Sequence, residues 1–223
     1  MCPGDFGAGR SNGLRWPVRR LTHPEKKSSK PTYRSPDIGL YSVKFWRWRG
    51  GSEYMLGAGL DVDVRRARIA DAVELSNLFR DSWRSTYRGL IPHTHLENMI
   101  QRRGPARWRS AIRSGEMVLL VEYQGKLIGY ATCGTARSRG AHKGEIYEIY
   151  LLPDYQGLGF GEFLFEACRY RLDQRHLKGL VVWALAENSQ AVNFYWNLGG
   201  RPLVSSYERI GGMRLEKIAF SWD

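Results

Sequence analysis

The chain has 223 residues, of which 43% are hydrophobic and 13% aromatic, and its formal net charge is +12. This length suits one domain with a substantial core and an extension. No apolar run approaches the roughly 20 residues of a membrane-spanning helix, so we expect no membrane partner. Because Pro3, Gly4 and Asp5 interrupt the first apolar residues, the sequence lacks a secretory signal and we expect a cytoplasmic location.

Three cysteines and one His-x-His pair are candidate metal ligands. Cys2, Cys133 and Cys168 match neither the spacing of a zinc site nor a disulfide framework. Cys133 and Cys168 stand in apolar surroundings, which favours packed thiols. His93 and His95 form a His-x-His pair that follows a proline, and no third ligand is evident. We therefore predict no metal site.

Residues 1–62 are rich in Gly, Pro, Ser and Lys and show neither the helical nor the strand period of apolar residues. They carry half of the net charge, so we predict a disordered basic extension. Trp46 and Trp48 stand among basic residues and would suit a nucleic-acid-binding arm, but no recognisable module accompanies them, and nucleic acid is not the partner we expect. Met55 is an alternative start of the chain.

Regular patterns begin after residue 62 and predict a single domain over residues 63–223. A helix is expected to carry apolar residues near one side, namely Val73, Leu75, Leu78, Phe79 and Trp83. The predicted elements are a strand at 61–69, a helix at 70–87, a helix after Pro92, a helix at 105–115, strands at 117–123, 127–135 and 145–152, a helix at about 159–176, a strand at 180–185, a helix at about 189–198, and strands at 202–209 and 213–220.

This order mixes hairpins with helical crossovers. The strands at 117–123 and 127–135 are separated by Gln-Gly-Lys, which predicts a hairpin. The fold class is therefore α/β (α+β), with a mixed, mainly antiparallel central sheet of about seven strands and helices on its faces.

A glycine-rich loop lies between the strand at 145–152 and the following helix. Main-chain N–H groups at a helix N-terminus attract anions, and residues without side chains let a bulky phosphate approach. A diphosphate is the expected ligand. The loop is neither a Walker loop, because the terminal Gly-Lys-Ser/Thr is missing, nor a dinucleotide fingerprint, because four strands precede or include it. Its residues are Gln156, Gly157, Leu158, Gly159, Phe160 and Gly161.

The loop resembles the pyrophosphate loop of the GNAT superfamily of N-acetyltransferases, which reads Arg or Gln, any, any, Gly, any, Gly or Ala. The lead-in "PDY" at 153–155 and the stretch "ENSQAVNFYWNLGGRP" at 187–202 are also similar to motifs of this family. The likeness covers about residues 63–223. It implies a GNAT-like fold, acetyl-CoA as co-substrate, and an acyltransferase that needs no metal.

The resemblance implies transfer of an acetyl group to a primary amine by direct attack, without a covalent acetyl-enzyme. The stretch at 82–99 is similar to the first helices of bacterial members whose acceptors are often amines or antibiotics. We therefore expect a small-molecule acceptor of the polyamine, antibiotic or amino-acid-like kind. A protein or peptide acceptor and a non-catalytic coenzyme A-binding module are the alternatives, and a homodimer is compatible with the family.

Several cofactor contacts follow from the same resemblance. The main chain of residues 156–161 would bind the diphosphate. The preceding strand is expected to separate from its neighbour near Tyr150, Leu151 and Leu152, so that its main chain pairs with the pantetheine arm and stabilises the oxyanion. Asn188 matches the asparagine that hydrogen-bonds the pantetheine.

Two side chains match the catalytic residues of the family. Glu145, eleven residues before Gln156, matches a glutamate base, which the reaction needs because an amine of pKa ~10.4 is mostly protonated at neutral pH. Glu148 or water alone are the alternatives, and strand alternation would place the two glutamates on opposite faces. A merely solvated carboxylate is the other interpretation of Glu145. Tyr195 matches the tyrosine that protonates the departing thiolate, and core packing beside Phe194 is its alternative role.

Overall fold

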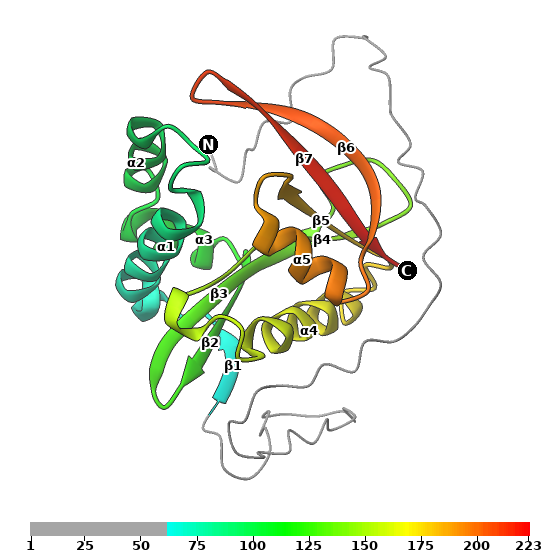
Figure 1. Cartoon of the computed structure of the whole chain (residues 1–223). Coiled ribbons are helices and arrows are strands. Elements are labelled where there is room, and N and C mark those ends of the chain that lie inside the picture. The colour runs from blue at the N-terminus through cyan, green and yellow to red at the C-terminus, as the bar shows by residue number, and fades with distance from the viewer. Residues whose placement is uncertain (1–61) are drawn as a thin grey trace, which may run out of the picture.

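The computed structural model describes residues 62–223 of the chain (Figure 1). The order of its helices and strands is the predicted order, and β1 begins one residue before the expected domain boundary. The predicted extension, its proposed arm and Met55 otherwise lie outside the described residues. The elements are β1 (Val62–Arg66), η1 (Ile69–Asp71), α1 (Ala72–Tyr87), α2 (His93–Gln101), α3 (Pro105–Arg113), β2 (Met117–Tyr123), β3 (Lys126–Thr135), β4 (Gly144–Leu151), η2 (Pro153–Tyr155), α4 (Phe160–Asp173), β5 (Leu180–Leu185), α5 (Ser189–Asn197), β6 (Arg201–Ile210) and β7 (Met213–Trp222).

The strands form one seven-stranded sheet in the order β1-β2-β3-β4-β5-β7-β6. Only β4 and β5 are parallel, and α4 is the crossover between them; every other neighbouring pair in the sheet is antiparallel. The turn between β2 and β3 consists of Gln124 and Gly125, whose φ angles are +50° and +72°, as a tight hairpin turn requires. The prediction of a mixed, mainly antiparallel sheet is confirmed.

Helices cover both faces of this sheet. Figure 1 shows α4 and α5 on one side and α1, α2 and α3 on the other. Ile146, Phe165 and Phe220 belong to the core under α4 and α5, whereas Phe79 and Trp108 belong to the core under α1 and α3. Within residues 62–223, no helix has both the length and the apolar character needed to cross a bilayer.

One side chain of α1 departs from the predicted apolar side. Leu75 and Phe79 are fully buried, whereas Val73 is 55% exposed. Two residues along a helix correspond to a rotation of about 200°, so Val73 faces away from the side that Leu75 presents to the sheet. Cys133 and Cys168 are buried free thiols, as predicted.

The parallel strands β4 and β5 separate soon after they begin. They pair at only three positions, the last being Ile146 with Val182. From there β4 continues beside β3 as far as Leu151, and β5 continues beside β7 as far as Leu185. The opening thus begins at Tyr147, earlier than the expected Tyr150. Beyond Ile146 the two facing edges have no strand partner within residues 62–223, so their main-chain groups are available to an extended ligand.

A bulge interrupts the pairing of β3 and β4. Glu148 lies opposite Thr132, and Ile146 lies opposite Cys133, which leaves Tyr147 as an extra residue in β4. An extra residue of this kind shifts the alternation of side chains between the two faces of a sheet.

The bulge places both candidate glutamates on one face. Ile146 points into the core under α4, so Glu145 beside it points to the opposite face. Tyr150 packs against the core under α1–α3, and Glu148, two residues before it, shares its face. The expectation that Glu145 and Glu148 lie on opposite faces is therefore wrong, because simple alternation does not account for the bulge.

Candidate active site

A cleft with a volume of about 590 Å³ occupies the opening between β4 and β5. Because the sheet is open there, the cleft reaches both of its faces. We call the part on the sheet face that α4 and α5 cover the α4–α5 half. It includes Gly157, Asn188 and Tyr195. The part on the other face is the α1–α3 half. Its lining side chains include Tyr87, Glu145, Glu148, Tyr150, Trp183, Glu208 and Lys217.

The glycine-rich loop borders the α4–α5 half. Gly157 and Gly159 have φ angles of +74° and +89°, and a Cβ atom added to either would meet no heavy atom within 4 Å. Side chains are thus disfavoured there by backbone conformation rather than by contacts within the protein. Gly159 is the N-cap of α4 and supplies no side-chain hydrogen bond. The first N–H groups of that helix therefore remain available to an anion.

Gly161 has a different role from the other two glycines of the loop. A Cβ atom at this position would approach Cε2 of Phe194 to 3.1 Å. The glycine thus lets the first turn of α4 pack against α5, the helix that carries Tyr195.

A chain of amide side chains joins the loop to its neighbours. Gln156 Nε2 donates a hydrogen bond to the carbonyl oxygen of Leu151 at 3.1 Å, and its Oε1 accepts one from Gln190 Nε2 at 2.7 Å. The end of β4, the loop and the start of α5 are therefore linked. Gln190 lines the cleft but was not selected from the sequence, because an exposed glutamine in a helix carries no particular signal.

Not every predicted cofactor residue presents its side chain to the cleft. Tyr150, Leu151, Gln156, Asn188 and the three glycines line it. Leu158 is 62% exposed, Phe160 packs against Tyr123 with ring centroids 5.2 Å apart, and Leu152 packs against the core under α1–α3. These three residues are not among those that line the cleft.

Asn188 is the N-cap of α5. Its Oδ1 accepts a hydrogen bond from the main-chain N–H of Ala191 at 3.1 Å. The side chain therefore caps α5 in addition to lining the cleft.

Tyr195 stands on α5 between the core and the cleft. It is 5% exposed, and its ring lies 5.3 Å from that of Phe194 and 5.8 Å from that of Phe220. Burial raises the pKa of Tyr195 far above its ordinary value, so the phenol stays protonated at neutral pH. Tyr195 thus packs in the core, which is its alternative role, and also lines the cleft, where a proton donor to the thiolate would have to lie.

Glu145 is buried, and both of its carboxylate oxygens accept hydrogen bonds. Its Oε2 accepts a hydrogen bond from the main-chain N–H of Arg137 at 2.7 Å, and its Oε1 accepts from Nε and Nη2 of the same residue at 3.0 and 2.6 Å. The interpretation as a solvated carboxylate is wrong, because only 1% of Glu145 is exposed. The guanidinium of Arg137 also lies 4.5 Å from the ring centroid of Tyr147.

Glu148 is buried, but only one of its two carboxylate oxygens accepts a hydrogen bond from the described residues. Its Oε1 accepts a hydrogen bond from Arg103 Nη1. Its Oε2 is also buried and has no hydrogen-bond partner among the described residues. Arg103 lies behind the cleft wall, 4.8 Å from the ring centroid of Phe79 and 4.3 Å from that of Trp108. Burial alone would lower the pKa of Arg103, but the adjacent Glu148 carboxylate raises it above its ordinary value.

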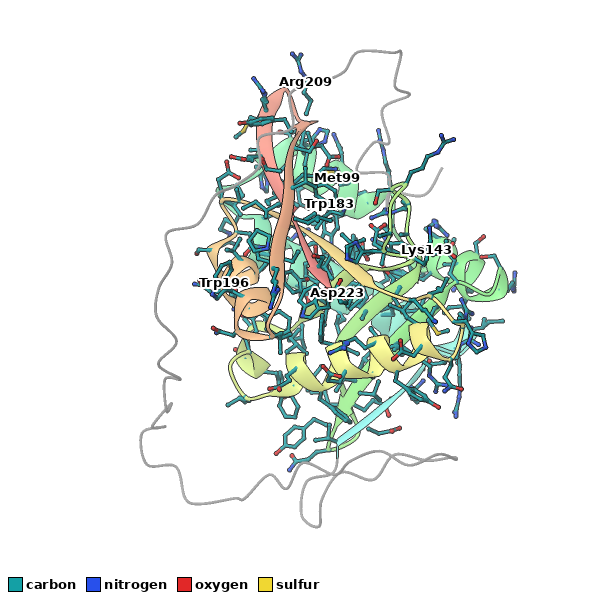
Figure 2. All side chains as sticks on the ribbon, turned by 90° about the vertical axis from the view of Figure 1, so that its right-hand side faces the viewer. Met99, Lys143, Trp183, Trp196, Arg209 and Asp223 are labelled. Carbon is teal, nitrogen blue, oxygen red and sulfur yellow. The ribbon has the colours of Figure 1, made fainter. Side chains whose placement is uncertain are left out.

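Aromatic and charged side chains complete the α1–α3 half. The hydroxyl groups of Tyr87 and Tyr150 lie 2.6 Å apart, and burial raises the pKa of Tyr87 to about 12. Lys217 donates to Glu208 at 3.2 Å and lies 4.9 Å from the ring centroid of Trp183, a residue near the middle of the molecule (Figure 2). Burial also raises the pKa of the Glu208 carboxyl.

The sequence alone does not point to Tyr87, Trp183, Glu208 or Lys217 as residues of this part of the cleft. They come from α1, β5, β6 and β7, and no local motif joins them. The only available signal was that each belongs to an element that the predicted sheet would bring near the loop.

The histidine pair lies elsewhere. His93 is the first residue of α2, as Pro92 suggested, and it borders a separate groove together with Arg88 and Met213. Among residues 62–223, no group of three or more His, Cys, Asp or Glu side chains is placed to hold a metal ion.

Comparison with known proteins identifies the family of this chain and relatives with a similar fold. The Acetyltransferase (GNAT) family matches residues 73–199. The uncharacterized N-acetyltransferase YuaI of Bacillus subtilis (strain 168) is 30% identical over 162 residues, or 72% of this chain and 92% of the relative. The spermidine N(1)-acetyltransferase of Thermoplasma acidophilum is 21% identical over 63% of this chain and 88% of that protein.

Solved structures support the same architecture. The PaiA N-acetyltransferase of Thermoplasma acidophilum, solved in complex with coenzyme A, has a TM-score of 0.58 and 20% sequence identity, with 73% of this chain and 99% of that chain covered. This similarity concerns the fold alone. The family match spans more than half of the chain, and the Bacillus relative aligns over nearly its whole length. The chain therefore belongs to the acetyltransferase (GNAT) family, whose members are acyltransferases.

Proposed function

We propose that this protein transfers the acetyl group of acetyl-CoA to a primary amine of a small molecule by direct attack. The observation that carries the proposal is a cleft that passes through the opened sheet between β4 and β5. An anion-binding loop borders one half, and buried carboxylates line the other. An anionic co-substrate and a cationic acceptor could thus meet in the opening between the strands.

The α4–α5 half suits coenzyme A. Main-chain N–H groups of the loop at 156–161 and of the first turn of α4 would bind the diphosphate, helped by the positive end of the helix dipole. The unpaired edges of β4 and β5 would hydrogen-bond the pantetheine arm as an added strand does. The related Thermoplasma structure was solved in complex with coenzyme A, which supports coenzyme A as the ligand.

Proton transfers complete the proposed reaction. A carboxylate of β4 takes one proton from the acceptor ammonium, directly or through water, and the freed lone pair attacks the thioester carbonyl. A main-chain N–H of the open β4 edge would stabilise the oxyanion. When the carbon–sulfur bond breaks, Tyr195 donates its proton to the thiolate, and the second proton released by the nitrogen returns to Tyr195.

A small amine is the favoured acceptor because the α1–α3 half is enclosed by aromatic and acidic side chains. Aromatic faces and carboxylates both attract an ammonium group. The spermidine N(1)-acetyltransferase among the relatives supports this class of acceptor.

Two measurements test the proposal. Calorimetry should show binding of coenzyme A, and release of free thiol from acetyl-CoA should accelerate with at least one member of a panel of polyamines, aminoglycosides and amino acids. Binding without turnover on any amine or peptide would favour the non-catalytic module. Turnover on peptides alone would replace the small-molecule acceptor with a protein or peptide.

A further inference from the structure

We propose that Glu148, held by Arg103, forms the ammonium subsite of the cleft and receives the proton of the acceptor, and that Glu145 has a structural role. The proposal rests on the proposed N-acetyltransferase function and identifies the group that recognises the amine. It differs from the assignment that the loop spacing favours, in which Glu145 is the base.

The hydrogen bonds of Glu145 argue against a role as base. Three donors of Arg137, two of them on a permanently charged guanidinium, occupy both carboxylate oxygens. Charge-assisted hydrogen bonds of this kind hold a carboxylate firmly in place. They tie β4 to the connection that follows β3. Glu145 therefore stabilises this wall of the cleft, and both of its oxygens already accept hydrogen bonds from Arg137.

Glu148 has the property that Glu145 lacks. Its Oε2 is buried, has no hydrogen-bond partner among residues 62–223, and belongs to a side chain that lines the cleft. Buried polar atoms in folded proteins are nearly always hydrogen-bonded. An unsatisfied anionic oxygen at the wall of a binding cleft thus marks a place where a ligand donor is expected, and an ammonium group supplies up to three donors.

Arg103 explains how this carboxylate is held. Arg103 is 7% exposed, its guanidinium packs over the rings of Phe79 and Trp108, and its Nη1 donates to Oε1 of Glu148. Arginine keeps its charge at any working pH. One oxygen of Glu148 is therefore fixed by the protein, while the other has no hydrogen-bond partner among residues 62–223. Arg103 acts through Glu148 and is a positioning residue.

The surroundings of Glu148 favour a cation. The phenols of Tyr87 and Tyr150 line the same half of the cleft, and their hydroxyl oxygens are further acceptors for an ammonium group. Burial, followed by the nearby charge of Glu148, raises the pKa of Tyr130 well above its ordinary value. The ring of Tyr130 stacks on that of Tyr150 with centroids 5.5 Å apart, so a second positive group in this half is attracted both by the carboxylate and by aromatic rings.

The proposed proton transfer involves only the acceptor and Glu148. One N–H bond of the acceptor ammonium breaks, its electron pair stays on nitrogen, and the proton bonds to Oε2 of Glu148. The neutral amine then attacks the acetyl carbon. Glu148 later releases the proton to solvent, so no oxidant, metal or further reactant is required.

Two matched variants test the inference, because Glu148→Gln and Glu145→Gln make the same near-isosteric change three residues apart on one strand. Protein saturated with coenzyme A is titrated with spermidine, propylamine and lysine, and the affinity for each amine is measured. Turnover with acetyl-CoA is measured separately. We expect Glu148→Gln to weaken amine binding about tenfold and to lower kcat/KM about 100-fold, with unchanged coenzyme A affinity. Glu145→Gln should bind amines as wild type does and melt at a lower temperature.

A second pair of variants addresses the positioning residue. Arg103→Met should raise KM and lower kcat together, and Arg103→Lys should recover part of the amine affinity because a cation is restored beside Oε1. If Arg103→Met does not fold, the lysine variant and the glutamate pair still decide the outcome.

Each contrary result has a distinct meaning. Wild-type amine binding by Glu148→Gln would overturn the inference, as would its loss in Glu145→Gln alone. A wild-type protein that binds coenzyme A but none of the three amines would also overturn it, while leaving the cofactor site intact. Amine binding that depends on Glu148 without any thiol release would support the subsite and refute the proposed transferase function.

Discussion

The two halves of the cleft are built from different parts of the polypeptide. The loop at 156–161, which borders the α4–α5 half, offers main-chain groups of one continuous stretch, in which Gly157 and Gly159 adopt left-handed conformations. The α1–α3 half depends on charged side chains held by ion pairs between distant segments, such as Arg103 with Glu148 and Lys217 with Glu208. The loop is local in sequence, whereas the α1–α3 half exists only in the folded chain.

This difference determines what substitutions in each half should change. Main-chain groups can hold a common co-substrate whatever side chains surround them, which suits the half that would bind coenzyme A. Side chains from several elements can change independently of that half, which suits recognition of the acceptor. Substitutions in the two halves should therefore affect separate measurements.

The largest effect is expected for Arg103→Met, which leaves the buried Glu148 carboxylate without its cation. Removal of one member of a buried ion pair typically costs about 3 to 5 kcal/mol of stability. Denaturant unfolding of wild type and variant measures the loss. The double variant Arg103→Met with Glu148→Gln is the control and should recover part of the stability. An unchanged unfolding midpoint in the single variant would show that the pair is not needed to hold the α1–α3 half.

Tyr195→Phe should act on the other half. The variant keeps the aromatic packing against Phe194 and Phe220 but lacks the proton donor, so kcat should fall about 100-fold while the Kd of coenzyme A and the melting temperature remain close to wild type. Steady-state kinetics and calorimetry provide the comparison. Phe220→Leu, which alters the same packing but keeps the phenol, is the control for an indirect effect. Undiminished kcat in Tyr195→Phe would remove the proposed acid.

Asn188→Ala should have a smaller effect, because it removes the cap of α5. Loss of such a cap usually costs about 1 kcal/mol. Coenzyme A affinity should decrease as well, since Asn188 also lines the α4–α5 half. Asn188→Asp is the matched control, because an aspartate retains the capping oxygen. A stability loss equal in both variants would mean that the hydrogen bond to Ala191 is not the cause.

The smallest effect is expected outside both halves, at Asp71. Arg65 donates two hydrogen bonds to this carboxylate, at 2.7 and 3.0 Å, and this interaction lowers the pKa of Asp71. The folded pKa is thus below the unfolded value of ~3.9. The stabilisation is complete above about pH 4 and is lost as the pH falls through the folded value.

Asp71→Asn should therefore destabilise the protein by less than about 1 kcal/mol at pH 7, and the difference from wild type should shrink below about pH 4. Thermal melts across this range measure it. Turnover at neutral pH should not change, because Asp71 does not line the cleft. A stability difference that stays constant down to pH 2 would contradict the assignment.

Prediction from sequence succeeded where the information was local. The glycine-rich loop is one continuous stretch, so its place before a helix could be read directly, and the order of elements followed from their separate patterns. Tyr195 belongs to a second continuous motif, and its position at the cleft needed no knowledge of long-range contacts.

The remaining features depend on contacts between distant segments. The ion pair of Arg103 and Glu148 joins residues 45 positions apart, and the sequence around Arg103 gives no sign of a partner. The bulge at Tyr147 becomes apparent only when β4 is paired with β3. The prediction that Val73 lies on the buried side of α1 was wrong for a different reason. The five apolar residues predicted for that side span too wide an arc of the helix to be buried together.

The extra residue in β4 affects how any related strand should be compared with this one. Counting back from the phosphate loop identifies a position in the chain but not the direction in which its side chain points. A homologue with the same count and a regular strand would turn one of its two acidic residues toward the opposite layer of helices. Superposition of the strands, rather than numbering alone, is needed to transfer a catalytic assignment to or from this protein.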